Sequence, residues 1–383
     1  MEARSEAFST DNIRRGMENS RQTKNDGIWR ALGKTGITPL GALSLLVLAL
    51  LPFIPPFNKE YLIRWLIGAV LLGAQALAFD FTSGYISIVN FGFCAFFGLG
   101  AYTSAVLAAK AGVSPWFGMF IGVFPAALLG FLTGVLTLRL RGIFAAVMAW
   151  FVGLALMGIA TKWVKVTEGP LGLNTPTLLK TSANLPYFYI ILVMMLVVYI
   201  VLKRVVASPV GLAFRAIGQN MEAARTSGIN PTRYRIINFT LSCAFAGWLG
   251  GFYAHYYGVL MPDVMSTAKT IEVLVVAYIG GRGSLWGGMF AAIPFVYAME
   301  FVRSFFSKLS GLNLVLYGLF LILIMIYYPG GVAKLYETLF GKSKNLVVKW
   351  LINKPDYQPR INKVSDQPSP KSEKAPSVGR ASL

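Results

Sequence analysis

The segment PVGLAFRAIGQNMEAARTSGINP, residues 209–231, is the most informative part of this chain. It is polar and basic, whereas long apolar runs lie on both sides of it. Of the 383 residues, 55% are hydrophobic, and the mean hydropathy is +0.60. Soluble domains are about 45–50% apolar, and runs of about 20 apolar residues are typical of membrane spans. We therefore expect an all-α polytopic membrane protein in which this segment lies outside the bilayer.

The order of residues within this segment predicts helices separated by tight turns. Gly218 is suited to end a first helix in the left-handed conformation, and Asn220 is suited to cap a second, short helix. Gly228 closes that second helix, and Asn230-Pro231 begins the next one. A rigid helix set between two glycines can transmit a movement from a partner protein to the adjoining spans.

Apolar windows predict about ten transmembrane or re-entrant helices. They lie at 38–56, 61–79, 88–109, 116–138, 143–161, 187–202, 236–260, 270–281, 287–303 and 312–328. The eighth window is too short to cross a bilayer alone, and a glycine-rich stretch follows it. We therefore expect a broken or re-entrant element there, with its backbone groups satisfied by protein or by a cavity.

Basic residues predict the orientation of the chain. The net charge is +19, and the Lys and Arg residues gather in loops and tails between apolar runs. This distribution follows the positive-inside rule and argues against nucleic-acid binding. Loop 203–235, with six Lys or Arg, is expected in the cytoplasm, and the mildly basic loop 162–186 outside. Residues 1–37 are predicted to be a cytoplasmic tail, 38–330 the membrane domain, and 331–383 a largely disordered cytoplasmic tail.

The short helix contains a motif that resembles one in ATP-binding cassette (ABC) importers. Glu222-Ala223-Ala224 is followed, after three residues, by Gly228. In the EAA motif of ABC-importer permeases, such a cytoplasmic helix docks into an ATPase subunit. Ala223 and Ala224 make one face slim enough for close docking, and Glu222 and Arg225 offer polar contacts. The resemblance implies that Glu222, Ala223, Ala224, Arg225 and Gly228 form an ATPase-coupling site.

Other blocks resemble the branched-chain amino acid ABC permease family of the LivH/LivM type, most closely its LivM branch. They are residues 213–255, SGYISIVNFGFCAFFGLGAYTSAVL at 83–107, IEVLVVAYIGGRGSLWGG at 271–288 and the loop TEGPLGL at 167–173. Together they cover most of residues 61–330. This chain has Ile88, Phe93 and Glu168 where the family often has Gln, His and Gly, so its 83–107 block is more apolar than the family pattern.

The resemblance implies a membrane-spanning permease subunit of an ATP-driven importer in a bacterial or archaeal plasma membrane. The implied partners are a second homologous permease, two ABC ATPase subunits that hold ATP and magnesium, and an extracytoplasmic solute-binding protein. Branched-chain or other apolar amino acids are the first solutes expected, and urea, short amides and small carboxylates are the alternatives. No cofactor and no catalytic residue is expected in this chain.

Two glycine-rich interruptions are expected to line the solute pathway, because the freed backbone groups of broken helices can meet a polar solute. The candidate pathway residues are Ser83, Ser87, Asn90, Gly92, Glu272, Gly280 and Gly281. Asn90 is equally suited to cap a helix or to form a hydrogen bond between helices.

ATP binding and hydrolytic chemistry are not expected in this chain. Gly33-Lys34-Thr35 and Gly341-Lys342-Ser343 both lack the earlier glycine that a P-loop requires. His255 is the only histidine, so a metal site based on histidine is not expected. A hydrolase dyad of His255 with Ser284 has neither an acid nor a GxSxG context.

An ion-gradient-driven carrier is the alternative from a different class. Asp80, Glu272 and Glu300 lie in or at the ends of predicted spans, where carboxylates are costly and usually functional. Glu300 lies one helical turn before Arg303 and is placed to pair with it. This alternative leaves the EAA-like loop unexplained.

The predicted orientation is tested with single cysteines at Thr226 and Thr177, in a background with Cys94 and Cys243 replaced. An impermeant thiol reagent added to intact cells is expected to label position 177 and to spare position 226. Labelling of position 226 from outside contradicts both the orientation and the coupling role, because cytoplasmic ATPases could not reach that loop.

Overall fold

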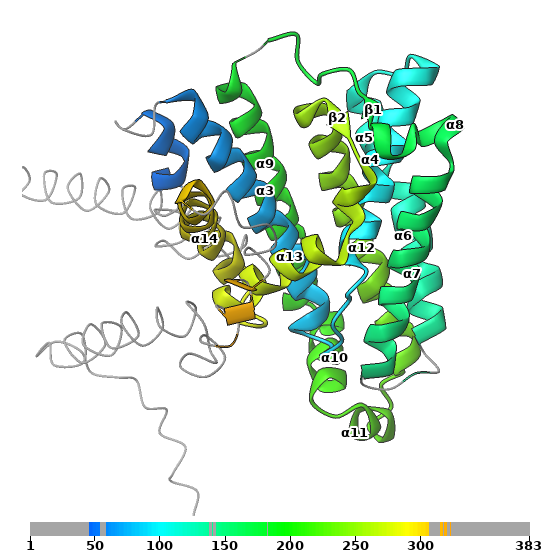
Figure 1. Cartoon of the computed structure of the whole chain (residues 1–383). Helices are drawn as coiled ribbons and strands as arrows, with labels where there is room; N and C mark the ends of the chain where they lie inside the picture. The colour runs from blue at the N-terminus through cyan, green and yellow to red at the C-terminus, as the bar shows by residue number, and fades with distance from the viewer. Residues whose placement is uncertain are drawn as a thin grey trace, which may run out of the picture. The chain divides into compact units, whose positions relative to one another are not determined.

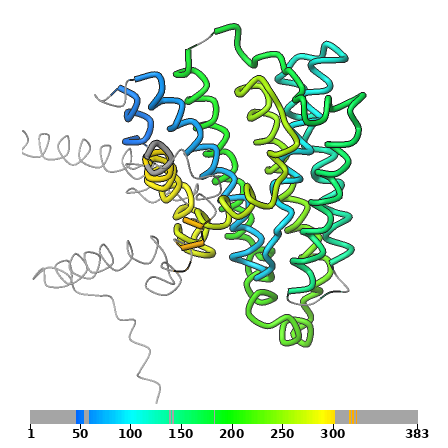
Figure 2. Tube along the Cα trace, in the orientation of Figure 1, coloured from blue at the N-terminus to red at the C-terminus, as the bar shows by residue number. Residues whose placement is uncertain are grey.

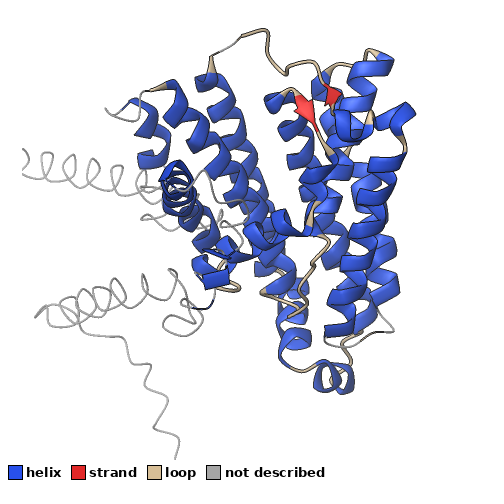
Figure 3. Ribbon diagram, viewed as in Figure 1, coloured by secondary structure: helices blue, strands red, loops and turns tan. Residues whose placement is uncertain are grey.

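We analysed a computed structural model, which describes residues 46–53, 59–137, 140, 143–181, 183–305, 315, 316, 318, 319 and 322. All of them belong to one compact unit, Met1–Leu335. The predicted tails 1–37 and 331–383 lie outside the described residues. Helices dominate this part of the chain, and the only strands within it are two short ones, distant in sequence, that pair antiparallel (Figure 3).

Helices of very different lengths follow one another along the chain, with the two short strands between them. In chain order the elements are η1 (Leu51–Phe53), α3 (Glu60–Ser83), α4 (Phe93–Ala111), α5 (Pro115–Ile121), α6 (Val123–Leu136), α7 (Ile143–Lys162), α8 (Val164–Thr167), η3 (Gly169–Leu171), β1 (Leu173–Asn174), α9 (Asn184–Ala207), α10 (Pro209–Gln219), α11 (Met221–Thr226), α12 (Pro231–Tyr257), β2 (Val259–Leu260), η4 (Pro262–Met265), α13 (Thr267–Gly280) and α14 (Trp286–Phe305).

Six spans within the described ranges are long and apolar enough to cross a membrane. They are α3, α4, α5 together with α6, α7, α9 and α12. The predicted all-α membrane fold is therefore confirmed. Helix α13 has 14 residues and is too short to cross alone, as the sequence predicts. The windows 38–56 and 312–328 fall largely outside the described residues, so only part of the predicted set of about ten helices is described.

Several predicted boundaries differ from the observed ones. The window 116–138 forms two helices that meet at Gly122, because Pro125 has no N–H to donate to the carbonyl of Ile121. Helix α12 begins at Pro231, as the Asn230-Pro231 pair predicts, since the Asn230 side chain accepts hydrogen bonds from its first turn, but it ends at Tyr257 rather than at 260. The window 287–303 forms α14, but the internal Pro294 and the polar ends leave it outside the six spans.

The helices α3 and α12 lie at the centre of the described bundle. In α3, 78% of the most apolar window is buried inside the protein, against 28% for α7, so α7 offers most of its surface to lipid. Helix α12 packs against α3, α4 and α6, and α3 also packs against α9 and α14 (Figure 1). The helices α3 and α14 lie side by side although they are near opposite ends of the described chain (Figure 2).

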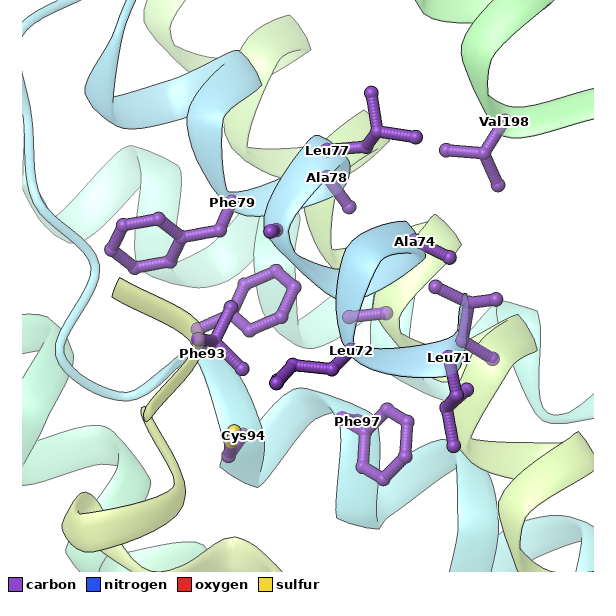
Figure 4. Close-up of a cluster of buried hydrophobic side chains, with 14 of the residues drawn as sticks. Leu71, Leu72, Ala74, Leu77, Ala78, Phe79, Phe93, Cys94, Phe97 and Val198 are labelled. Carbon is purple, nitrogen blue, oxygen red and sulfur yellow. The ribbon is translucent and has the colours of Figure 1, made fainter. Parts of the chain in front are cut away.

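Apolar side chains of α3 and α4 form the middle of the core. Leu72 of α3 lies near Phe93, Cys94 and Phe97 of α4 (Figure 4). The ring of Phe79 meets that of Phe93 edge to face, with 5.6 Å between centroids. Cys94 and Cys243 are both buried free thiols.

Glycines allow α12 to approach its neighbours closely. An added Cβ at Gly247 would meet the Ala126 side chain, and one at Gly250 would meet the carbonyl oxygen of Phe97. The pairs Gly118/Gly122 and Gly130/Gly134 likewise face α4 and α12. Such contacts are how helices associate when lipid provides no hydrophobic drive between them.

The contact at Gly250 can be tested by adding one methyl group. Gly250→Ala forces the α4 and α12 backbones apart, and overpacking of this kind costs about 1–3 kcal/mol. Thermal unfolding of the detergent-solubilised protein should therefore shift to a lower temperature. Gly158→Ala is the matched control, because no atom lies within 4 Å of a Cβ added there. Equal unfolding temperatures for Gly250→Ala and the unmodified protein would contradict this packing.

Candidate functional site

The helices α10 and α11 lie together at one end of the bundle (Figure 1). Helix α11 directly precedes the first turn of α12, whereas Leu178 donates to the carbonyl of His255 near the other end of α12. Residues around 178 and residues in α11 therefore lie at opposite ends of α12, which is compatible with their placement on opposite sides of a membrane.

Both ends of α11 are fixed by hydrogen bonds within the segment. The Asn220 side chain accepts from the backbone N–H groups of Glu222 and Ala223, at 3.0 and 3.1 Å. At the other end, Gly228 has a left-handed φ of +82°, and Ile229 donates to the carbonyl of Ala224. This is the Schellman pattern of helix termination. The predicted roles of Asn220 and Gly228 in the local fold are confirmed.

Most side chains of α11 are available at the protein surface. In this helix only Ala224 is buried. Glu222 and Arg225 lie 3.6 Å apart as an exposed ion pair, with Ala223 exposed between them. An exposed pair of this kind adds little to stability. The caps at its ends fix the short helix, and its exposed side chains form a small surface with polar groups at its rim.

Helix α10 anchors this segment to the bundle. Phe214 is fully buried, and its ring meets Phe81 of α3 at 5.5 Å and Tyr234 of α12 at 6.1 Å, both edge to face. The prediction that Gly218 ends this helix in the left-handed conformation is wrong, since α10 continues to Gln219 and Asn220 is extended. Gly218 instead allows close approach, because an added Cβ would meet the carbonyl oxygen of Tyr85.

The non-helical segment 84–92 connects α10 with α3 and α4. The Ser87 hydroxyl donates to the carbonyl of Gly218 at 3.0 Å. The guanidinium of Arg215 lies over the Tyr85 ring, 5.6 Å from its centroid. Ser87 itself has a φ of +62°, which L-residues rarely adopt. Backbone strain at a contact with α10 marks this segment as one whose position is determined by its surroundings.

Asp80 joins the end of α3 to the break between α13 and α14. Its two carboxyl oxygens accept from the backbone N–H groups of Gly283, at 2.8 Å, and Leu285, at 3.2 Å. Arg282 donates to the carbonyl of Ser83 at 3.0 Å. Leu285 has a left-handed φ of +56°, so these bonds hold a turn that costs about 1–2 kcal/mol in isolation. We call residues 281–285 the Asp80-bound turn.

The structure places six of the seven predicted pathway residues in two groups. Ser83 is the last residue of α3, and Ser87, Asn90 and Gly92 lie in the segment 84–92 that follows it. Asn90 is buried, with its side chain accepting from the N–H of Gly92 just before α4. The Asn90 amide also donates to Cys243 Sγ of α12 at 4.0 Å, so its contacts are a local turn bond before α4 and the interhelical alternative. Gly280 and Gly281 lie at the end of α13, where Gly280 packs against the backbone of Gly287 and Gly288.

Glu272, the remaining predicted pathway residue, lines a cavity of about 580 Å³ between α3, α4, α12, α13 and α14. The cavity extends from Tyr61 and Arg64, near the start of α3, to Gln75. Fourteen helical residues correspond to about 21 Å of depth. Helix α13 contributes Lys269, Glu272 and Val273 to this cavity and ends at the Asp80-bound turn.

Other polar residues have structural partners that the sequence did not indicate. His255 is fully buried between Ser104, at 2.8 Å, and the carbonyl of Pro176, at 2.7 Å. Ser284 donates to Gly280 instead, so a His255–Ser284 dyad is not formed. Arg235 is also buried, and it donates to the carbonyl of Thr137 at the end of α6.

The loop at 167–173 contains one departure from the family pattern, Glu168, in a backbone conformation that suits glycine. Glu168 has a left-handed φ of +59°. Glycine, the residue that the resemblance leads one to expect here, adopts this conformation without steric cost.

The side chain of Arg303 lies outside the described residues, so the predicted Glu300–Arg303 pair is not described.

The spans and the ordered polar segment define a multi-pass, all-α membrane protein. A model of the family "Branched-chain amino acid transport system / permease component" matches residues 61–326, and the chain belongs to this family. It is thus a permease component of an ABC importer, in the inner membrane.

The chain is 26% identical over 328 residues to the high-affinity branched-chain amino acid transport system permease protein LivM of Salmonella typhimurium, covering 78% of this chain and 76% of that protein. LivM of Escherichia coli K12 is 27% identical with the same coverage. The nucleoside ABC transporter permease protein NupC of Lactococcus lactis is 28% identical over 264 residues, 62% of this chain and 82% of NupC. No solved structure matches.

Replacement of Asp80 tests the Asp80-bound turn. Asp80→Asn leaves one acceptor oxygen for two backbone donors, and an unsatisfied buried donor costs about 1–3 kcal/mol. We expect a lower unfolding temperature and faster proteolysis within 281–285. Asp263→Asn is the control, because that exposed side chain forms no hydrogen bond with any residue in the described ranges. If the two variants behave alike, the turn is held by other contacts.

Proposed function

We propose that this chain is the membrane-spanning permease subunit of an importer for branched-chain or other apolar amino acids, and that α11 is the surface on which an ABC ATPase acts. The observation that supports the coupling role best is the rigid, doubly capped α11, with Glu222, Ala223 and Arg225 exposed on it. Membership in the permease family supports the existence of ATPase partners and of an extracytoplasmic binding protein.

The contacts around α10 suggest how a push on α11 reaches the membrane domain. Phe214 packs on Phe81, one residue after Asp80, and Gly218 contacts the segment that begins at the end of α3. Asp80 in turn holds the turn that ends α13. A displacement of α10 therefore moves the end of α3 and, through it, the short helix that lines the cavity. ATP and magnesium belong to the ATPases in this scheme, and the present chain performs no catalysis.

The proposed assembly contains a second, homologous permease, two ATPase subunits and a binding protein. The loop 203–235 and both tails, 1–37 and 331–383, are placed in the cytoplasm, in line with their basic charge. Residues 38–330 form the permease domain in this scheme. The binding protein meets the opposite end of the bundle, where the loop that precedes α9 lies.

The choice of solute rests on the more extensive similarity to LivM. The LivM proteins of Salmonella typhimurium and Escherichia coli align with 78% of this chain, whereas NupC, a nucleoside permease by its name, aligns with 62%. Apolar amino acids are therefore our first proposal, ahead of urea, short amides and small carboxylates. An ion-gradient-driven carrier, which would use acids such as Glu272 and Glu300, predicts uptake that vanadate does not inhibit.

Gly228→Val tests the coupling role. The left-handed conformation at Gly228 costs a β-branched residue about 1–2 kcal/mol, so α11 should shift or fray while the chain still inserts. In proteoliposomes with the complete transporter, we expect ATP hydrolysis to lose its stimulation by solute, and uptake to fall with it.

Gly112→Val is the matched control for this variant. Gly112 has a φ of +65° and, like Gly228, has no atom within 4 Å of an added Cβ, but it ends α4 rather than α11. It should therefore show similar strain and keep normal coupling. Unchanged solute-stimulated ATPase activity in Gly228→Val would contradict the assignment of α11 as the ATPase-coupling helix.

A further inference from the structure

The cavity between α3, α4, α12, α13 and α14 contains charges of both signs in an otherwise apolar wall. Two cations, Arg64 and Lys269, and two acids, Glu272 and Glu300, line it, so its formal charge is balanced. Charged groups in a membrane domain are costly and are kept where they serve a pathway or a site. A balanced set of this kind suits a solute that is itself a zwitterion.

Gln75 gives a second, independent indication of a ligand. Its side chain lies deep in the cavity, only 8% of the residue is exposed, and it forms no hydrogen bond with any residue in the described ranges. An amide that lines a cavity and has no protein partner there is satisfied by water or by a solute that enters. Because an amide both donates and accepts, Gln75 can bind either a carboxylate or an ammonium group.

The remaining walls suit an apolar side chain. Leu71, Leu72 and Val264 are buried and line the same cavity. Aromatic rings continue this surface, since Tyr253 lies 5.5 Å from Phe97 and 4.4 Å from Tyr257, centroid to centroid. The guanidinium of Arg64 lies 5.9 Å from the centroid of the Tyr257 ring, near the mouth. A volume of about 580 Å³ leaves room for a small amino acid together with water.

We propose that this cavity is a binding site for zwitterionic amino acids, which it recognises through their α-ammonium and α-carboxylate groups, with Gln75, Glu272 and Arg64 as recognition residues. The apolar wall accepts the side chain with little discrimination, because one methylene in an apolar pocket changes binding only modestly. The site therefore rejects uncharged solutes of similar size, such as nucleosides. This inference rests on the proposed function, since it identifies the solute class of the same pathway.

The position of α13 connects the proposed solute site to the segment that contacts α10, and so to the proposed ATPase surface. Lys269 and Glu272 form an ion pair at 3.2 Å on the first turns of α13, and the last residue of that helix precedes the Asp80-bound turn. The N–H of Cys94 donates to the Thr270 hydroxyl at 3.2 Å, which fixes α13 against α4. A movement of α13 thus changes the wall that holds the solute.

The test uses protection of a cysteine on the cavity wall. Val296 lines the cavity and is partly exposed. Val296→Cys is introduced in a background with Cys94 and Cys243 replaced, and the complete transporter is placed in nanodiscs without ATP or binding protein. The rate of labelling by N-ethylmaleimide is measured with leucine, leucinamide, 4-methylpentanoate and uridine. We expect leucine to slow labelling several-fold and the other three solutes to leave it unchanged.

Two variants connect the protection to the recognition residues. Glu272→Gln and Gln75→Leu should each raise the leucine concentration for half-maximal protection by about tenfold, the change expected for one lost charge-assisted hydrogen bond. Glu60→Gln is the matched control. Glu60 lies at the start of α3, where it accepts from Asn184 at 2.6 Å, and it does not line the cavity.

The outcomes separate the site from the proposed function. Equal protection by all four solutes, protection by uridine alone, or no protection by leucine would each overturn the zwitterion site. ATP-dependent uptake of leucine is measured with the same preparations. If uptake persists while protection is absent, the site is wrong and the importer function stands. If leucine protects but ATP drives no uptake, the site stands and the importer function is wrong.

Discussion

The end of α3 is the point on which the described structure depends. The last carbonyls of a helix have no partner within it, and at membrane depth water cannot supply one. In this protein other segments supply donors to two of these carbonyls, because Asn238 of α12 donates to that of Phe81 and Arg282 donates to that of Ser83. Ser242 of α12 also donates to the carbonyl of Ala78, one turn earlier. Asp80 adds two bonds to residues 283 and 285. The end of α3 therefore connects α12, the turn between α13 and α14, and the segment 84–92 that contacts α10.

This arrangement accounts for the use of irregular backbone in the middle of the bundle. The segments 84–92 and 281–285 both interrupt helices, and each provides partners for the other through the end of α3. Gly84 shows how close they are, since an added Cβ would lie 2.5 Å from both Asp80 Oδ1 and the N–H nitrogen of Gly283. Because the two non-helical segments provide hydrogen-bond partners for each other's region, they can move together without leaving backbone N–H or C=O groups unpaired in lipid. A transporter needs such movements.

The sequence predicts what is local and misses what is distant. The spans, the short α13, and the caps at Asn220 and Gly228 follow from periodicity and turn chemistry within a few residues. The prediction for Gly218 is wrong because its small size serves a contact with Tyr85, far away in the chain. The bond from Gly283 to Asp80 joins positions 203 residues apart, and no pattern in one sequence indicates it. Gln75 is not predicted as a site residue, because a single amide in an apolar helix forms no motif with residues at a fixed spacing.

The way in which α11 is held has a consequence for how such subunits diversify. Its fold depends on Asn220 before it, Gly228 after it, the buried Ala224 and the partly buried Met221, whereas Glu222, Ala223, Arg225 and Thr226 are exposed. Substitutions at those exposed positions leave the architecture of the membrane domain untouched. If the ATPase binds α11, as proposed, an exchange of a few exposed residues is enough to change which ATPase a permease pairs with, in evolution or by design.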